Sequence, residues 1–170
     1  MGWGYGFKCS KCKREYSYGV GVGFMFPEVY ENLMKEVKKG KYGEEWKDLA
    51  LKTKHVAIDA EEYLYCCSKC GNWKTEEGLS LYEPKDIEQL KKYEQQGKGR
   101  WAVGLDFKDA SYVTTEDLRE YYKILKKYIH RCEKCGTRMH RANMEESLNL
   151  KCPKCGGKPL KDHVCPIRWD

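Results

Sequence analysis

The sequence predicts an α+β fold in which two small β modules carry inserted and connecting helices. Three observations support this prediction. Aromatic and small residues alternate in segments such as residues 3–8, which predicts short strands. Apolar residues recur at helical spacing in segments such as residues 27–40, which predicts amphipathic helices. Eight of the ten cysteines form four Cys-x-x-Cys pairs, each of which is expected to form a tight β-turn.

The composition is that of a globular chain. Of the 170 residues, 41% are hydrophobic and 13% aromatic, which is too apolar for a disordered chain even though 34% are charged. The longest uncharged run, residues 16–27, is too short to cross a bilayer, and the N-terminus has no secretory pattern. We therefore expect a soluble, cytoplasmic protein with no membrane partner, whose oligomeric state is left open.

The first cysteine pair is expected at the turn of a β-hairpin. Aromatic residues alternate with glycines in residues 3–8, which lead into Cys9, and the period of two continues through residues 14–23 after Cys12. The glycines let this backbone pass close to a neighbouring strand. The Gly-x-Gly-x-Gly run at residues 19–23 does not predict a phosphate-binding loop, because no Lys-Ser/Thr follows it.

Two helices are predicted next. The first begins at Pro27, where the missing N–H is tolerated, and ends at Gly40. Its expected apolar stripe consists of Val29, Tyr30, Leu33, Met34 and Val37. The second helix is expected at about residues 44–54. We interpret this helix pair as an insertion in the first β module that covers one side of its sheet.

The middle of the chain predicts strands at residues 57–65 and 79–82 and a helix at residues 84–96. A loop rich in glycine and basic residues follows this helix and marks the predicted domain boundary. The predicted domains are residues 1–97 and residues 98–170.

The second domain is predicted to begin with a strand at residues 101–107, where apolar residues alternate. One helix is then expected over residues 114–129, and Thr114 and Asp117 have the spacing of a capping box at its start. This helix would lead directly into Cys132 and attach the last cysteine pairs to an ordered element.

The spacing of the paired cysteines is typical of metal binding. Two Cys-x-x-Cys turns supply four thiolates to one tetrahedral Zn²⁺, and nothing in the sequence favours an exported disulfide framework. One predicted site consists of Cys132, Cys135, Cys152 and Cys155. The other consists of Cys9, Cys12, Cys67 and Cys70, with fifty-four residues between its two pairs. Because four sulfurs leave no open coordination position, we expect two structural zinc ions and no catalysis.

The residue after the second cysteine of each pair is expected to have a left-handed backbone. Gly71, Gly136 and Gly156 occupy this position in three pairs. Lys13 occupies it in the first pair, which predicts a different turn there.

Four further residues with metal-binding side chains lie near these pairs. Cys66 and Cys165 are expected to be free thiols, with Cys66 as an alternative to Cys67 in a Cys-x-x-x-Cys arrangement. His140 and His163 would bind metal only in place of one of the paired cysteines, so surface or supporting roles are expected for them.

The two C-terminal pairs, each followed by glycine, resemble zinc-ribbon and rubredoxin-like domains. The resemblance covers about the last forty residues, and the first half of the chain resembles a zinc ribbon with a large insertion. It implies two zinc-ribbon-like modules with structural zinc. The rubredoxin-like alternative implies iron and one-electron transfer, but the short loop and the surplus of lysine favour zinc. The layout also resembles uncharacterised bacterial zinc-ribbon proteins, a resemblance that implies no activity.

The basic residues suggest a partner. They outnumber acidic residues by four to one in residues 1–26 and by nine to five in residues 130–170, although the whole chain has a formal charge of only +6. Part of this excess offsets the negative charge of zinc bound by four thiolates. Nucleic acid is the favoured partner, and a protein–protein interaction adaptor is the alternative. The candidate nucleic-acid contacts are Lys8, Lys11, Lys13, Arg14, Arg131, Lys134, Arg138 and Arg141.

Overall fold

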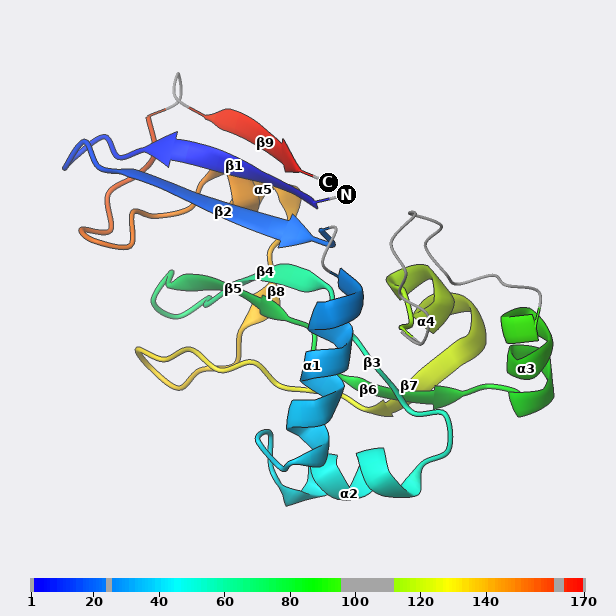
Figure 1. Cartoon of the computed structure of the whole chain (residues 1–170). Coiled ribbons are helices and arrows are strands. Elements are labelled where there is room, and N and C mark those ends of the chain that lie inside the picture. Colours follow the sequence, from blue (N-terminus) through cyan, green and yellow to red (C-terminus); the bar gives the residue numbers. More distant parts are fainter. Residues whose placement is uncertain (1, 24–25, 96–111, 161–163, 170) are drawn as a thin grey trace. The chain divides into compact units, whose positions relative to one another are not determined.

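The chain folds into two compact units, each built from segments that are not consecutive in the sequence (Figure 1). The computed structural model describes residues 2–23, 26–95, 112–160 and 164–169. The first unit, which we call the cysteine unit because it contains all ten cysteines, comprises Met1–Phe24, Glu62–Glu77 and Ile129–Asp170. The second, which we call the helical unit, comprises Met25–Glu61 and Gly78–Tyr128.

These units differ from the predicted domains at residues 1–97 and 98–170. The chain passes from one unit to the other four times, and the predicted boundary lies outside the described residues. The predicted boundary at a single loop requires each domain to be one continuous segment, whereas each unit combines separate segments. The α+β class is confirmed, because the described residues form helices together with antiparallel sheets.

One antiparallel sheet organises the cysteine unit, with the strand order β5-β4-β2-β1-β9 and with β8 also paired to β4. Its strands are β1 (Gly2–Lys8), β2 (Glu15–Gly21), β4 (Glu62–Cys66), β5 (Trp73–Glu77), β8 (His140–Arg141) and β9 (Cys165–Trp169). The unit also contains the short helix α5 (Met144–Leu148). The predicted strands at residues 3–8 and 14–23 are confirmed, whereas β5, β8 and β9 have no counterpart among the predicted elements.

Two hairpins form most of this sheet, and each has a Cys-x-x-Cys pair at its turn. Hairpin 1 joins β1 to β2, and hairpin 2 joins β4 to β5. In hairpin 1 the strands approach so closely that a Cβ on Gly4 would lie 2.0 Å from the carbonyl oxygen of Tyr18. Only glycine permits this approach, which confirms the role expected for a strand glycine.

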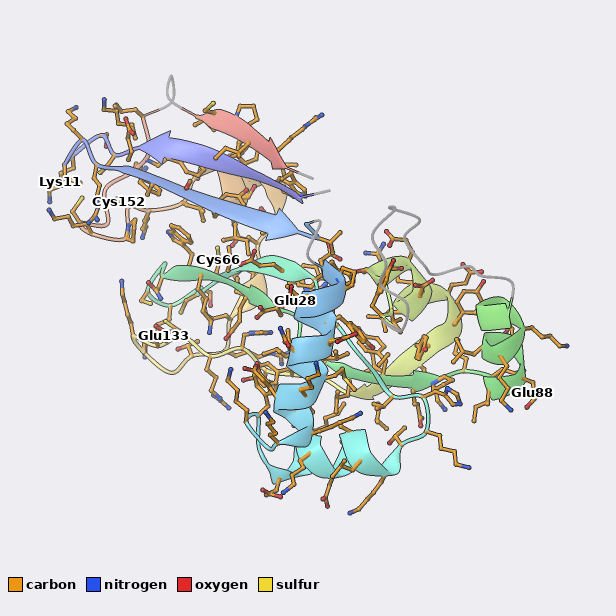
Figure 2. The ribbon with its side chains drawn as sticks, in the orientation of Figure 1. Lys11, Glu28, Cys66, Glu88, Glu133 and Cys152 are labelled. Atoms are coloured by element: carbon orange, nitrogen blue, oxygen red, sulfur yellow. The ribbon has the colours of Figure 1, made fainter. Side chains whose placement is uncertain are left out.

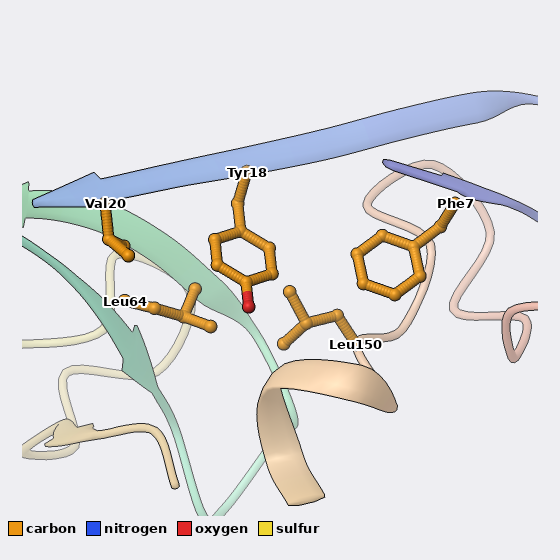
Figure 3. Packing of buried hydrophobic residues seen from close by; sticks show 5 residues of the cluster. All are labelled: Phe7, Tyr18, Val20, Leu64 and Leu150. Atoms are coloured by element: carbon orange, nitrogen blue, oxygen red, sulfur yellow. The ribbon is translucent and has the colours of Figure 1, made fainter. Parts of the chain in front are cut away.

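The core of the cysteine unit brings the two hairpins together with the segment that follows α5. Its buried cluster consists of Phe7, Tyr18, Val20, Leu64 and Leu150 (Figure 3). Figure 3 shows Leu150 facing Tyr18 of β2, with Leu64 of β4 beside them. Burying an aliphatic or aromatic side chain of this size contributes about 1.5–3 kcal/mol, so this cluster stabilises the contact among the three segments.

The helical unit contains a second antiparallel sheet, with the strand order β3-β6-β7. Its strands are β3 (Ala57–Ile58), β6 (Leu81–Pro84) and β7 (Tyr122–Lys126). The helices described in this unit are α1 (Phe26–Lys38), α2 (Glu44–Lys52), α3 (Ile87–Gln95) and α4 (Thr115–Tyr121). None of the described helices has the length and apolar character needed to span a membrane.

The helices α1, α2 and α3 confirm three predicted helices. The apolar stripe predicted for α1 is correct at Tyr30, Leu33 and Val37, which are buried, but Val29 is 37% exposed. We expected α1 and α2 to cover the sheet of the first β module. Both belong instead to the helical unit, where α1 contacts α2 and β3.

The predicted helix at residues 114–129 is wrong beyond Tyr121. It begins as expected, because Thr114 and Asp117 form a capping box. The chain then extends into β7, which pairs with β6. Aromatic and β-branched residues such as Tyr122 and Ile124 favour a strand, and pairing with β6 overrides the helical spacing of the apolar residues. The strand predicted at residues 101–107 lies outside the described residues.

Candidate metal centres

The eight paired cysteines form two groups, both in the cysteine unit. Site 1 consists of Cys9, Cys12, Cys152 and Cys155. Site 2 consists of Cys67, Cys70, Cys132 and Cys135. Within each site the four sulfur atoms all lie within 4.8 Å of one another. Figure 2 labels Lys11, in the turn of hairpin 1, and Cys152, which is far from it in the sequence. Both lie in the same part of the cysteine unit.

The structure corrects the predicted grouping of these ligands. The sequence grouped the first pair with the second and the third with the fourth, but site 1 joins the first pair to the fourth and site 2 joins the second to the third. Cys12 Sγ lies 3.7 Å from Cys152 Sγ although 140 positions separate the two residues. The short segment between Cys135 and Cys152 contains β8 and α5 and links the two sites.

The sulfur geometry fits a tetrahedral ion. The distance from Cys9 Sγ to Cys155 Sγ is 3.5 Å, and that from Cys67 Sγ to Cys135 Sγ is also 3.5 Å. A disulfide would require about 2.05 Å. A tetrahedral zinc ion with Zn–S bonds of about 2.3 Å has sulfurs about 3.8 Å apart. Each site is therefore a four-thiolate group that can hold one metal ion.

All four Cys-x-x-Cys turns have the same backbone hydrogen bonds. In each turn the first cysteine makes two backbone hydrogen bonds. Its N–H donates to the carbonyl of the fifth residue after it, and its carbonyl accepts from the N–H of the fourth residue after it. The residue at this fourth position has a positive φ in every turn: 59° at Lys13, 68° at Gly71, 70° at Gly136 and 68° at Gly156. The different turn predicted at Lys13 is therefore wrong. Lys13 adopts the left-handed conformation, and its ammonium donates to the Ser10 carbonyl at 3.0 Å.

Hydrogen-bond donors in these turns favour the thiolate form that binds metal. At site 1, the Cys12 N–H donates to Cys9 Sγ at 3.5 Å and lowers the pKa of Cys9 to about 6. At site 2, the Thr137 hydroxyl lies 3.4 Å from Cys135 Sγ and lowers the pKa of Cys135 to about 6. Each site thus holds a cysteine whose thiolate is favoured, whereas hydrogen bonds with neighbouring sulfurs help to raise the pKa of Cys155 at site 1 and of Cys70 at site 2 to about 11.

Site 1 brings together basic residues from both ends of the chain. Ser10 donates to the Lys158 carbonyl through its N–H and its hydroxyl, both at 2.9 Å. The Leu160 N–H donates to the Lys8 carbonyl at 2.8 Å. The segments that meet here carry seven basic residues, of which Lys151 extends over the site 2 turn: Lys8, Lys11, Lys13, Arg14, Lys151, Lys154 and Lys158. The first four were predicted as nucleic-acid contacts. Lys151, Lys154 and Lys158 were not, and Lys154 was expected to offset the negative charge of the thiolates.

Site 2 packs against a small core of its own. Cys67 and Cys132 lie in a buried cluster with Tyr65 and Met139. The buried His130 stacks on Tyr65 with ring centroids 3.8 Å apart. His130 Nδ1 also lies 2.7 Å from a carboxylate oxygen of Glu76. His130 and Glu76 were not predicted from the sequence. The one available signal was that His130 lies two residues before Cys132.

The basic residues predicted around site 2 have varied surroundings. The Arg131 guanidinium donates to the Gly136 carbonyl at 3.2 Å, and the Arg141 guanidinium lies 3.4 Å from the centre of the Tyr63 ring. Lys134 and Arg138 are exposed. These four residues are adjacent to the same metal site but are not joined there by a second basic segment.

The alternative ligands are not part of either group. Cys66 packs against the hydrophobic core, where burial raises the pKa of its thiol to about 11, so Cys67 is the site 2 residue. Cys165 is exposed. His140 Nε2 lies 2.8 Å from Glu146, and His163 lies outside the described residues.

Comparisons of this chain with protein-family models, with curated proteins and with solved structures gave no match. The likeness to zinc ribbons therefore rests on the two four-cysteine groups and their turns.

Proposed function

We propose that this protein is a non-catalytic nucleic-acid-binding module in which two structural zinc ions support a basic surface at site 1. The observation that carries the proposal is the meeting at one metal site of residues 8–14 and 151–158, which together carry seven basic residues. Neither segment alone carries as many basic residues. The closed sulfur groups support a structural role for the metal, because four protein ligands complete a tetrahedral ion.

The charge at site 1 exceeds what the metal requires. Zinc bound by four thiolates has a net negative charge, which two lysines would balance. The segments around site 1 carry seven basic residues, and Glu15 is the acidic residue next to them. All but Lys8 are exposed. The surplus of positive charge fits a polyanion, and the phosphates of nucleic acid are such a partner.

The aromatic residues near site 1 favour contact with phosphates over stacking on bases. The Tyr16 hydroxyl donates to the Leu150 carbonyl at 2.6 Å, and the Trp73 indole N–H donates to the Lys151 carbonyl at 2.7 Å. Both rings are half-buried against the hydrophobic core. Because phosphate contacts do not read base identity, we expect binding that depends weakly on sequence.

A binding series in rising salt tests the nucleic-acid proposal. The variant Lys11→Gln/Lys154→Gln/Lys158→Gln is expected to bind short DNA duplexes more weakly and to reduce the salt slope by about 0.9 per lost phosphate contact. The matched control is Lys39→Gln/Lys54→Gln/Lys92→Gln, which removes three exposed lysines from the helical unit. No binding by the unaltered protein at low salt, absence of a salt slope, or equal losses in both variants would reject the proposal.

Elemental analysis tests the identity of the metal. We expect two zinc ions per chain and a colourless protein, because Zn²⁺ has a filled d shell. A red, iron-containing protein would favour the rubredoxin-like electron carrier instead.

A further inference from the structure

The segment between Cys135 of site 2 and Cys152 of site 1 is attached to hairpin 2. Its strand β8 pairs with β4, so that His140 lies opposite Cys66, next to the site 2 ligand Cys67. The Ala142 N–H then donates to the Leu64 carbonyl at 2.8 Å. The segment that leads into site 1 is therefore aligned by a strand that leads into site 2.

The end of this segment is bound by both hairpins immediately before Cys152. The Leu150 carbonyl accepts the Tyr16 hydroxyl of hairpin 1 at 2.6 Å. The next carbonyl, that of Lys151, accepts the Trp73 indole N–H of hairpin 2 at 2.7 Å. The Lys151 side chain also lies over the site 2 turn, since a Cβ on Gly71 would be 2.9 Å from its ammonium nitrogen.

We propose that Trp73 positions the Cys152 turn and thereby couples the two metal sites, so that metal at one site raises the affinity of the other. This inference rests on the metal-binding part of the proposed function and is independent of nucleic acid. The two carbonyls precede a site 1 ligand, and their donors follow the hairpin turns that carry Cys12 and Cys70. The Trp73–Lys151 bond therefore joins site 2 to site 1, whereas the Tyr16–Leu150 bond joins the two turns of site 1.

Loop closure alone supplies a small part of this coupling. Site 1 joins residues 140 positions apart, and site 2 joins residues 68 positions apart within that interval. Closing site 2 first removes about half of the loop that site 1 must close. Halving a loop favours its closure about threefold, so a larger factor requires contacts that both sites share.

The shared hydrophobic core supplies those contacts. Its buried cluster contains Phe7 and Tyr18 from hairpin 1, Leu64 from hairpin 2 and Leu150 from the linking segment. This cluster forms only when all three segments meet, and each metal site fixes two of them. We therefore expect metal at one site to raise the affinity of the other tenfold or more. Because coupling is reciprocal, the factor must be the same in both directions.

Titration of the metal-free full chain with Co²⁺ measures the coupling, because tetrahedral Co²⁺ thiolate sites absorb visible light. The affinity of site 1 is measured in the unaltered chain and in Cys67→Ser/Cys70→Ser. The affinity of site 2 is measured in the unaltered chain and in Cys9→Ser/Cys12→Ser. Equal losses of tenfold or more are expected. Losses of threefold or less, or unequal losses, would overturn the coupling. Failure of the unaltered chain to bind Co²⁺ would instead reject the metal-binding proposal.

A conservative variant tests whether Trp73 carries the coupling. Trp73→Phe keeps a ring and removes the donor, so the coupling factor should fall at least threefold while each isolated site keeps its visible spectrum. Tyr16→Phe removes a bond within site 1 and should leave the coupling factor unchanged. The matched control is Trp46→Phe, which removes an indole N–H that donates to the Leu79 carbonyl at 3.0 Å within the helical unit. An unchanged coupling factor in Trp73→Phe, or an equal fall in Tyr16→Phe or Trp46→Phe, would contradict the assignment.

Discussion

The two metal sites have the same turns but different surroundings. Both are formed by one hairpin turn and one C-terminal turn with the same backbone hydrogen bonds. Site 2 contributes Cys67 and Cys132 to a buried cluster with Tyr65 and Met139, whereas the two segments that form site 1 carry seven basic residues, six of them exposed. Hairpin 1 has four basic residues and one acidic residue, but hairpin 2 has two basic and three acidic residues.

This comparison separates what the metal requires from what a partner requires. Four thiolates present the same need for nearby positive charge at either site, so the greater surplus at site 1 is not explained by the metal. The buried cluster at site 2 is similarly not required to form the metal site, because each turn is closed by its own backbone hydrogen bonds. We therefore interpret site 2 as the structural anchor of the unit and site 1 as its binding surface.

The largest predicted effect follows from replacing ligands in pairs. Cys9→Ser/Cys152→Ser alters site 1 alone and should retain one metal ion, whereas Cys9→Ser/Cys132→Ser alters both sites and should retain none. Metal-dependent folding energy is on the order of 10 kcal/mol for small zinc modules, so the second variant should lose the fold of the cysteine unit. Metal analysis and circular dichroism measure these outcomes.

The controls for this experiment are Cys66→Ser and Cys165→Ser, which should keep both ions because neither cysteine belongs to a site. If Cys9→Ser/Cys152→Ser lost both ions while Cys9→Ser/Cys67→Ser kept one, the pairing in the structure would be refuted.

Core truncations should distinguish the two sites next. Leu150 and Met139 are 3% and 4% exposed, so replacing either by alanine should cost about 2–5 kcal/mol of unfolding free energy. Leu150→Ala should weaken metal binding at both sites, because its cluster contains residues from both hairpins. Met139→Ala should act mainly on site 2, whose ligands share its cluster. Denaturant unfolding and Co²⁺ titration would show this difference, and equal effects on both sites by both variants would contradict it.

The Glu76–His130 pair at site 2 predicts a dependence of stability on pH. The hydrogen bond from His130, with help from Lys74, lowers the pKa of Glu76 in the folded protein. The stabilisation is therefore complete above the unfolded pKa of about 4.3 and is lost as the pH falls through the lower folded pKa. Glu76→Gln should lose about 1.5–3 kcal/mol at pH 7, the range for hydrogen bonds to charged groups.

The control for this prediction is Glu133→Gln, which changes an exposed carboxylate near the same site. Thermal unfolding of all three proteins over a range of pH should show a gap between the unaltered protein and Glu76→Gln that closes in acid. A gap that is independent of pH would contradict the role of the ionised Glu76 carboxylate.

The smallest predicted effects concern the left-handed residue of each turn. Gly71→Ala and Gly136→Ala should each lower the free energy of unfolding by about 1–2 kcal/mol, because both glycines have φ near 70°, a left-handed conformation that alanine adopts only with strain. Gly71→Ala should cost more, since its Cβ would lie 2.9 Å from the Lys151 ammonium whereas a Cβ on Gly136 meets open space. At site 1, Lys13→Gly should raise the free energy of unfolding by up to about 1 kcal/mol, because glycine adopts this left-handed conformation without strain. Urea unfolding measures all three changes, and a loss of stability in Lys13→Gly would contradict this account.

Several elements could be predicted from the sequence because their causes are local. The capping box at Thr114 and the helix beginning near Pro27 depend on residues within one turn of each other. The extent of the helix after Thr114 could not be predicted in the same way. Residues from Tyr122 onward have helical spacing, but their pairing with β6 depends on a strand about forty positions earlier in the chain.

By itself, the sequence indicated the four Cys-x-x-Cys pairs and the left-handed turn in the three pairs that are followed by glycine, but not the same turn at Lys13. Each turn closes through hydrogen bonds that span at most five residues, so local spacing carries most of this information. Only the tertiary structure decided which turns share a metal. Closing a loop of 140 residues instead of sixteen costs only about 2 kcal/mol more, because loop entropy grows with the logarithm of length. Burying one or two core side chains, as Leu64 and Leu150 are buried here, offsets that difference.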